Sequence, residues 1–485
     1  MNRAIRRVGI GVTVLVLLLV GQLTYLQVYD ADHLANDPRN IRFQLRDFSK
    51  PRGRIVSADG QIVARSVETG DELKFQRLYP QGELFSQLAG YQSFVFGNTG
   101  IERTYNNELS GRDPLLQIKN LGDVLAGKET VGNVVLSTSQ QLQTAARDAL
   151  RGQHGSVVVM NPKTGGVLAM YSNPSYDPQP FASHNSQAAQ DYEKLLRANP
   201  DKPDLPRAYR ELFAPGSTFK VITSSVALGT GQFTPDTNFP TLTELKLPQT
   251  TNTLKNFGGE SCGGTLALSF TVSCNTTFGQ IGLDLGDAFV PGMEKFGIGS
   301  APPLDVAPGA VSSVGPPAGS FQQNQPLFAF AGIGQGDVAV TPLQMALSAS
   351  AVANNGQIMQ PHVADRITDA SDNTVKTIDP KAWRTAMSPQ VAATMKTLME
   401  SVVNSPQGTG TAAQIPGVSV AGKTGTAQNQ TGNAHAWFVG FAPAEDPQVV
   451  VAVIVEHGGS AGSEATGGHV AAPIAAQMMR MVLGR

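Results

Sequence analysis

The sequence has few of the residues that build metal or redox centres. Only two of its 485 residues are cysteine and seven are histidine, and the histidines do not cluster. Neither a Cys-x-x-Cys nor a His-Glu-x-x-His pattern occurs, and these are ligand spacings typical of zinc sites. We therefore expect no metal site and no cofactor.

Charge is also sparse. Charged residues make up 15% of the chain, the formal net charge is -2, and no long run of one sign appears. A nucleic-acid partner is therefore not expected, because it would call for a broad basic surface. The apolar fraction of 41% is ordinary, so a chain of this length has material for a sizeable core in two or three domains.

Long apolar runs are absent except at the start. Residues 8–29 contain no charged side chain, and Arg3, Arg6 and Arg7 precede them. A helix of this length covers roughly 30 Å, the thickness of the hydrocarbon core. The alternative is a cleaved signal peptide, but no small-x-small site follows the run. We expect a single membrane anchor, with residues 1–7 in the cytoplasm and everything after Asp30 outside the membrane.

The two cysteines are Cys262 and Cys274. In an exported chain such a pair favours a disulfide, and the alternative is two buried free thiols. Closing this short loop would stabilise the fold by roughly 2–3 kcal/mol on a chain-entropy model.

Local patterns divide the chain after the anchor into an N-terminal non-catalytic module, residues 30–152, and a catalytic domain, residues 153–485. From residue 156 onward apolar strands and helices alternate, which is typical of α/β or α+β domains. The polar segment 181–206 is expected to be a mobile cover. The expected strands are 50–56, 59–64, 156–160, 167–171, 436–441 and 449–455, and the expected helices are 100–109, 139–150, 218–228, 341–356 and 470–483.

The stretch around Ser217 is the first candidate for chemistry. Pro215-Gly216 ends the preceding segment and a helical pattern follows, so Ser217 is expected at a helix N-terminus with Lys220 one turn away on the same face. A hydroxyl at the positive end of a helix beside a lysine can form an activated nucleophile. The alternative is that Ser217 only caps the helix and Lys220 is a solvated charge.

Two further short motifs follow in the sequence. They are Ser273-Cys274-Asn275 and Lys423-Thr424-Gly425-Thr426, and each alone is as typical of a cap or a turn. In this order the three motifs resemble the S-x-x-K, S-x-N and K-T-G set of the penicillin-recognising serine acyltransferases. Lys423 lies between two apolar segments, so its motif is expected on a strand that faces the Ser217 helix.

The chemistry of peptide acyl transfer gives these residues their expected roles. Ser217 would be the nucleophile, and Lys220 its base, kept neutral by burial and by the positive Lys423. Ser273 would carry a proton between the two lysines to the leaving amine, and Asn275 would orient Lys220 and hold a substrate amide.

The third motif is expected to bind the substrate. Thr424 and Thr426 would bind a terminal carboxylate, and Gly425 would let the substrate backbone approach the strand. The resemblance implies that the backbone N–H groups of Ser217 and Thr426 form the oxyanion hole.

Further motifs, two of them in the N-terminal module, indicate which class of this family the chain resembles. Arg52-Gly53-Arg54-Ile55 with Asp59-Gly60, Gly100-Ile101-Glu102 with Tyr105, and Gly334-Gln335-Gly336 with Thr341-Pro342 resemble class B penicillin-binding proteins. The resemblance implies an α+β multi-domain protein. Its transpeptidase domain would have a penicillin-binding/β-lactamase-like fold, with an antiparallel sheet flanked by helices and a helical subdomain. The anchor and the long module argue against a secreted class A β-lactamase, and no segment is large enough for the glycosyltransferase domain of a bifunctional synthase.

The same resemblance implies a peptidoglycan D,D-transpeptidase of the cell membrane that cross-links stem peptides ending in D-Ala-D-Ala. It would release D-Ala, be acylated at Ser217 by β-lactams, and act with division or elongation complex proteins. Carboxypeptidase activity stays open, because water can replace the acceptor amine. A scaffold or β-lactam sensor is the alternative from another class. A sensor needs more cytoplasmic chain than residues 1–7, and a scaffold needs no intact set of three motifs.

Overall fold

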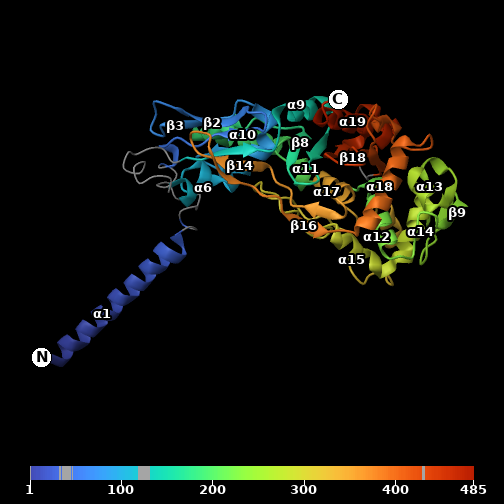
Figure 1. Cartoon of the computed structure of the whole chain (residues 1–485). Coiled ribbons are helices and arrows are strands. Elements are labelled where there is room, and N and C mark those ends of the chain that lie inside the picture. The colour runs from blue at the N-terminus through green and yellow to red at the C-terminus, as the bar shows by residue number, and fades with distance from the viewer. Residues whose placement is uncertain (1, 32–33, 35–44, 46, 118–130, 429–431) are drawn as a thin grey trace.

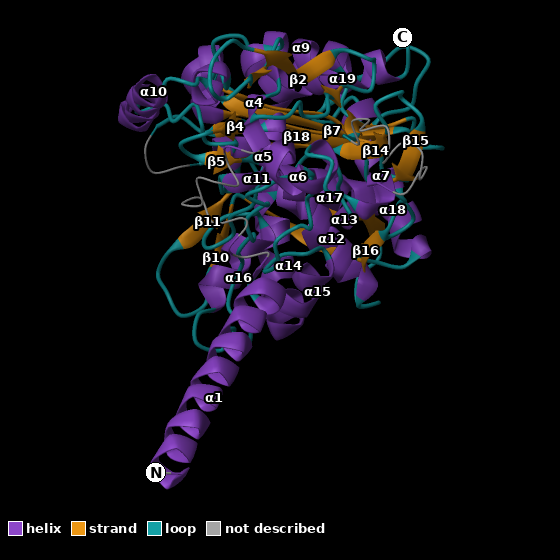
Figure 2. Cartoon of the chain, turned by 90° about the vertical axis from the view of Figure 1, so that its left-hand side faces the viewer, coloured by secondary structure: helices purple, strands orange, loops and turns teal. Residues whose placement is uncertain are grey.

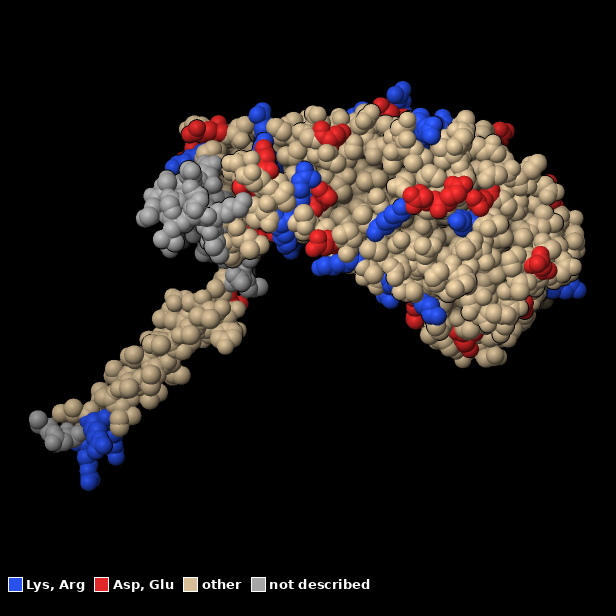
Figure 3. Space-filling model, viewed as in Figure 1, with Lys and Arg blue, Asp and Glu red and all other residues tan. Residues whose placement is uncertain are grey.

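The computed structural model describes the whole chain except residues 1, 32–33, 35–44, 46, 118–130 and 429–431. Parts of the expected module 30–152 therefore lie outside the described residues. Helix α1, Asn2–Thr24, continues as a π-helical turn over Tyr25–Tyr29 and stands apart from the body as a rod (Figure 1). Residues Ile5–Tyr29 are long and apolar enough to cross a membrane. Basic side chains gather at the outer end of α1, and the rest of the helix surface is almost uncharged (Figure 3).

A six-stranded sheet forms the centre of the N-terminal region, in the order β15-β14-β6-β1-β2-β3. The expected Asp-Gly hairpin is present as β1 and β2. Two strands of the sheet, β14 and β15, come from the distant end of the chain, and β14 pairs with β6 antiparallel, with Ala364 opposite Leu136. The strands are β1 Ile55–Val56, β2 Ile62–Glu68, β3 Phe75–Leu78, β6 Asn133–Leu136, β14 Ala364–Thr368 and β15 Thr374–Thr377.

A buried ion cluster ties this region together. Glu102 Oε2 accepts from Arg52 Nε and Glu102 Oε1 from Arg77 Nε, both at 2.6 Å, and all three side chains are buried. Burial alone would raise the pKa of Glu102, but the two guanidinium groups hold it below its usual value. Glu102 lies on one of two short helices that break at Tyr105, where a single helix was expected. The short elements here are α4 Ser86–Ala89, β4 Gln92–Ser93, β5 Gly97–Asn98, α5 Gly100–Thr104, α6 Asn106–Leu109 and α7 Pro114–Gln117.

The catalytic region is built on a five-stranded antiparallel sheet in the order β17-β18-β19-β7-β8. Its central strands are continuous apolar runs because helices cover both faces. Both apolar strand pairs predicted for this domain, 156–160 with 167–171 and 436–441 with 449–455, are strands of this sheet. The strands are β7 Gly155–Met160, β8 Val167–Asn173, β17 Ala421–Ala427, β18 His435–Ala442 and β19 Val449–Val455.

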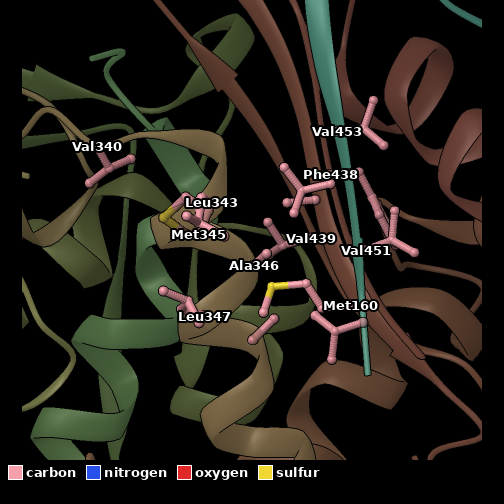
Figure 4. Packing of buried hydrophobic residues seen from close by; sticks show 14 of the residues in the cluster. Met160, Val340, Leu343, Met345, Ala346, Leu347, Phe438, Val439, Val451 and Val453 are labelled. Atoms are coloured by element: carbon pink, nitrogen blue, oxygen red, sulfur yellow. The ribbon is translucent and has the colours of Figure 1, made fainter. Parts of the chain in front are cut away.

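Helices α9 and α19 pack on one face of this sheet, and α17 and α11 on the other (Figure 2). Ser139 caps α9 by accepting from Leu142 N, and Thr341 caps α17 in the same way, as their sequences predict. Ala346 and Leu347 of α17 lie in the core close to Val439 and Met160 of the sheet (Figure 4). These helices are α9 Gln140–Ala149, α11 Arg207–Arg210, α17 Pro342–Ala353 and α19 Ala472–Val482.

A helical subdomain lies at the end of the sheet formed by β17. Helix α18 packs on β17 and also contacts α12 and α13. The helices are α12 Lys220–Gly229, α13 Leu266–Thr271, α14 Asn275–Leu285, α15 Phe289–Lys295, α16 Gln325–Gly332 and α18 Pro389–Asn404. Short ribbons border them, namely β9 Asn238–Leu242 with β12 Cys262–Thr265, β10 Glu244–Lys246 with β11 Thr253–Lys255, and β13 Gln357–Met359 with β16 Ala382–Thr385.

The segment 181–206, expected to be a mobile cover, contains regular structure. Helix α10, Ser186–Ala198, starts at Asn185, whose side chain accepts from Gln187 N and Ala188 N. An aromatic cluster anchors it, in which Tyr192 contacts the ring of Phe181 edge-on at 5.3 Å between centroids. The polar composition reflects one exposed helix face, because the opposite face packs on these rings.

Candidate active site

Ser217 lies in a 3₁₀ turn, η4 Gly216–Phe219, that leads directly into α12. The expected helix N-terminus is confirmed, and its first turn is tighter than an α-helix. Gly216 has φ +53°, and a Cβ there would come within 3.0 Å of Thr426 O. Glycine is therefore required at this position, because the turn needs a left-handed residue that also lies against β17.

The side chains of Lys220 and Lys423 converge on Ser273. Lys220 Nζ donates to Ser273 O and to Asn275 Oδ1, both at 2.8 Å, and lies 3.2 Å from Ser273 Oγ. Lys423 Nζ donates to the same Oγ at 2.9 Å. One hydroxyl thus links two amines that lie far apart in the sequence. The arrangement joins all three motifs at a single atom.

Both lysines are fully buried. Burial lowers the pKa of Lys220 well below its usual value, and the neighbouring Lys423 lowers it further. Burial also lowers the pKa of Lys423, to about 7. Both causes expected from the sequence therefore act on Lys220, burial being the larger, and Lys423 itself carries a weakened charge near neutral pH.

Ser273 adopts a backbone conformation that is rare for a residue with a side chain, with φ +63°. It connects α13 to α14, and Asn275 opens α14. Asn275 Nδ2 donates to Lys255 O at 3.1 Å, which orients its Oδ1 toward Lys220. The predicted disulfide between Cys262 and Cys274 is confirmed, and it ties the residue between Ser273 and Asn275 to strand β12.

Strand β17 carries Lys423 to Thr426 at the edge of the sheet, facing the Ser217 turn. Its register places Thr424 opposite Phe438 and Thr426 opposite Ala436 of β18. We expected Gly425 to make room for substrate backbone. A Cβ on Gly425 would instead meet Pro215 O at 2.9 Å and Thr218 N at 3.1 Å, so this glycine is required by the approach of the nucleophile turn.

A cavity of about 310 Å³ lies between the turn, the Ser273 loop and β17. Six of the predicted site residues line it, namely Ser217, Ser273, Asn275, Thr424, Gly425 and Thr426. The two lysines and the two cysteines lie behind this lining. Among the described residues, the Ser217 hydroxyl makes no hydrogen bond, so the expected contact with Lys220 is not formed in this state, and the hydroxyl faces the open cavity.

The structure adds lining residues that the sequence did not single out for the site. Thr409 Oγ1 lies 2.6 Å from Thr424 Oγ1, which fixes the hydroxyl expected to bind a carboxylate. Phe257 is 69% exposed and forms an apolar rim. The remaining additions are Val272, Ile333, Gln335, Thr466, Gly467 and Gly468. Of these, Gln335 belongs to the Gly334-Gln335-Gly336 motif noted in the sequence, and a Cβ on Gly467 would lie 2.5 Å from Gly425 O.

The geometry provides the parts that acyl transfer needs. A primary hydroxyl faces the cavity, an amine of lowered pKa lies one turn away, and a second hydroxyl connects that amine to another. The turn that holds Ser217 packs against β17 beside Thr426, the other residue expected to supply an oxyanion N–H group.

Two family models match the chain. The penicillin binding protein transpeptidase domain matches residues 155–480, a range that holds every residue lining the cavity. The penicillin binding protein A dimerisation domain matches residues 52–135.

The chain is 41% identical to the peptidoglycan D,D-transpeptidase PbpA of Mycolicibacterium smegmatis, over 98% of this chain and 97% of that protein. It is 38% identical to the protein of the same name from Mycobacterium tuberculosis, over 100% of this chain and 99% of that one. Among solved structures, the ceftriaxone acyl-enzyme complex of penicillin-binding protein A from M. tuberculosis superposes with a TM-score of 0.83. The sequences there are 36% identical, over 90% of this chain and 100% of that chain.

Proposed function

The chain belongs to the penicillin-binding protein transpeptidase family, and on this premise we propose that it is a peptidoglycan D,D-transpeptidase working through a Ser217 acyl-enzyme. The observation that carries the mechanism is the position of Ser273 Oγ between Lys220 Nζ and Lys423 Nζ. This contact gives a proton a continuous route across the site. A scaffold would gain nothing from burying two lysines at such a cost in desolvation.

In the acylation step, Ser217 Oγ attacks the carbonyl carbon of the peptide bond between the two terminal D-Ala residues. Lys220, as the neutral amine, accepts the hydroxyl proton, and its lowered pKa favours this neutral form. The backbone N–H groups of Ser217 and Thr426 stabilise the oxyanion of the tetrahedral intermediate. The hydroxyls of Thr424 and Thr426 bind the terminal carboxylate of the substrate.

Collapse of the intermediate breaks the C–N bond and leaves an ester on Ser217. The departing D-Ala nitrogen takes, through Ser273 Oγ, the proton that Lys220 accepted from Ser217, so Lys220 returns to the neutral amine. In the second half-reaction the amine of a second stem peptide attacks the ester carbonyl and forms the cross-link. Lys220 removes a proton from that amine and returns it to Ser217 Oγ as the ester C–O bond breaks. A β-lactam enters by the same first step, but its ring opens without releasing a leaving group, so the enzyme stays acylated.

We also propose the topology and the setting of this reaction. The basic residues before the apolar helix place the N-terminus in the cytoplasm, and the catalytic region then lies outside the membrane, where peptidoglycan is assembled. The same proposal divides the chain into a tail 1–7, an anchor 8–29, a module 30–152 and a catalytic domain 153–485. Proteins of the division or elongation machinery are its proposed partners.

The nucleophile is tested by covalent labelling with a fluorescent penicillin. The wild-type chain is expected to label, and Ser217→Ala is expected to abolish the labelled band. Ser224→Ala is the matched control, because Ser224 lies two turns along the same segment, is buried, and lines no part of the cavity. Persistent labelling of Ser217→Ala would sink the assignment.

Transpeptidation is tested by product analysis on a lipid-linked glycan polymer carrying pentapeptide stems. Cross-linked stems are expected as the major product, together with released D-Ala. Release of D-Ala without cross-links would make the protein a D,D-carboxypeptidase, in which water attacks the same acyl-enzyme.

A further inference from the structure

A second cavity, of about 400 Å³, lies where three segments of the chain meet, and it shares no lining residue with the catalytic cavity. The segments are the end of β6 with Ser137, the loop between β7 and β8, and the stretch from His362 into β14. We call it the junction cavity. Strands β8 and β17 are opposite edges of the five-stranded sheet, so the junction cavity lies at the edge remote from Lys423.

The walls of the junction cavity are held by backbone hydrogen bonds between the three segments. Ser137 N donates to Val363 O at 2.8 Å, and Val167 N donates to His362 O at 2.9 Å. His362 N in turn donates to Gly165 O at 3.1 Å. A ligand in this cavity would therefore meet preformed walls and would not need to order a loose segment.

His362 lines the junction cavity, and one nitrogen of its imidazole is unused. The residue is 7% exposed, and its Nδ1 lies 2.7 Å from Ala364 O, which can only accept, so Nδ1 carries a hydrogen. Nε2 is buried and has no hydrogen-bond partner among the described residues. A buried polar atom without a partner is costly, so this nitrogen calls for a hydrogen-bonding ligand group.

The floor of the junction cavity is open because residue 166 is glycine. A Cβ at Gly166 would lie 3.3 Å from Thr164 Oγ1, 3.5 Å from Ser137 Cβ and 3.6 Å from His362 Cε1. Side chains from all three segments thus surround one point. A small group placed there would touch each of them.

Both signs of charge face the same space. Asp365 Oδ2 pairs with Arg366 Nη1 at 2.6 Å, and both side chains are about half exposed, which leaves the second carboxylate oxygen and further guanidinium N–H groups for a ligand. Asn161 Oδ1 accepts from Lys163 N and Thr164 N, so its NH₂ group remains as a donor. A ligand that carries only one charge would leave either the carboxylate or the guanidinium and amide donors without a partner.

We propose that the junction cavity binds a small zwitterion, namely a free amino acid or a short peptide. Its ammonium group would donate to Asp365 and to His362 Nε2, and its carboxylate would accept from Arg366 and the Asn161 amide. The aliphatic side chains of Leu136, Leu168 and Ile378 complete the lining and suit a small apolar side chain. A volume of this size is within the range of small-molecule sites.

The test uses the full-length protein in detergent after complete acylation by penicillin, which blocks the catalytic cavity. Alanyl-alanine, in its D,D and L,L forms, is the probe, and binding is followed by titration calorimetry and by hydrogen exchange. Saturable binding of at least one form is expected, with added protection at residues 161–168 and 362–366. N-acetylation or C-terminal amidation of the dipeptide is expected to weaken binding, since each removes one charge.

Two variants locate the site. Arg366→Gln is expected to weaken binding about tenfold or more, the loss of one charge-assisted contact. Arg151→Gln is the matched control, an exposed arginine that lines neither cavity, and should leave binding unchanged. His362→Asn keeps a donor near the Nδ1 position and removes Nε2, so it should also weaken binding.

The proposal fails if neither dipeptide binds the acylated protein saturably, or if Arg366→Gln and Arg151→Gln bind equally well. Equal binding of the dipeptide with both ends blocked, or binding of N-acetylglucosamine in its place, would overturn the zwitterion assignment. Arg366 is about half exposed and its substitution leaves the core intact, so the test does not depend on the more buried His362 variant.

Discussion

At the scale of single residues, Ser273 combines a strained backbone with a central position. Its φ of +63° costs of order 1 kcal/mol for a residue with a Cβ, yet this conformation places Oγ between the two buried amines. Strain of this kind persists where the surroundings hold it, and here the disulfide at Cys274 and the start of α14 do so. The strain and the chemistry of Ser273 can be separated by substitution.

Ser273→Ala and Ser273→Gly both remove the hydroxyl, but only glycine accepts the positive φ without strain. We expect both to slow acylation by penicillin about 10²-fold, because each breaks the proton route. We expect Ser273→Gly to be more stable than Ser273→Ala by about 1 kcal/mol. Stopped-flow acylation and thermal unfolding measure the two effects. An alanine variant that acylates at the wild-type rate would remove Ser273 from the proton route.

The lowered pKa of Lys220 sets the acid limb of the pH profile of acylation, that is, the pH below which the acylation rate falls. Below that pKa the amine is protonated and cannot accept the Ser217 proton, so the rate falls as the pH is lowered. In Lys423→Gln the Coulombic part of the shift disappears, so the pKa of Lys220 rises and the acid limb moves to higher pH. Single-turnover acylation from pH 4 to 9 shows this movement. A limb that stays in place would mean that burial alone sets the pKa.

At the scale of elements, the nucleophile turn is fixed to the sheet by strand β18. The fully buried Trp437 donates from Nε1 to Ala214 O at 3.1 Å, and its ring meets Phe213 edge-on. Gly216 N donates to Gly334 O at 2.9 Å on the other side of the turn. The position of Ser217 therefore depends on two elements that come later in the chain.

Trp437→Phe keeps an aromatic ring in the core and removes the donor. The carbonyl of Ala214 then loses its partner, so we expect a stability loss of about 1–3 kcal/mol and slower acylation. Trp383→Phe is the control, because Trp383 is the other tryptophan of the chain, lies within β16 and does not line the catalytic cavity. Unfolding midpoints and acylation rates of the two variants should differ. Equal rates would show that the hydrogen bond does not position Ser217.

How much of the structure could be predicted from the sequence depends on how far apart in the chain the interacting residues lie. The helices that start at Ser139 and Thr341, the hairpin β7–β8 and the apolar strands β18 and β19 depend on neighbours in the chain, and their patterns located them. The break at Tyr105 and the regular helix α10 depend on packing against distant rings, which a local pattern does not show. The three motifs identified the core of the site because their chemistry fixes their residue types. The sequence did not indicate Thr409 as a site residue, because a threonine beside glycines forms no distinctive pattern. Its role becomes visible only where the fold places its hydroxyl next to that of Thr424.

At the scale of the whole molecule, an apolar rod stands apart from a mixed-charge body (Figure 3). The catalytic cavity is formed entirely by residues after position 216. The short module and the cysteine within Ser273-Cys274-Asn275 favour a relation to penicillin-binding protein A, and the comparisons confirm this relation.

A chain that starts at Lys50 is expected to leave the membrane fraction while keeping its penicillin labelling. Loss of the apolar helix removes the membrane affinity, and none of the residues before position 50 that the structure describes lines the catalytic cavity. Fractionation followed by fluorescent penicillin labelling measures both properties. Retention in washed membranes would point to a second membrane-binding surface, and loss of labelling in a folded truncated chain would show that the first 49 residues support the site.

Strands β14 and β15 join the six-stranded sheet although they follow β6 by more than two hundred residues. The N-terminal part is thus not one contiguous segment of the sequence, and it cannot be exchanged as a single piece. Exchanging residues 30–152 with those of another protein would leave β14 facing a foreign edge strand in place of β6. Homologous recombination between such genes would yield working hybrids only when the ribbon 364–377 travels with its distant partner.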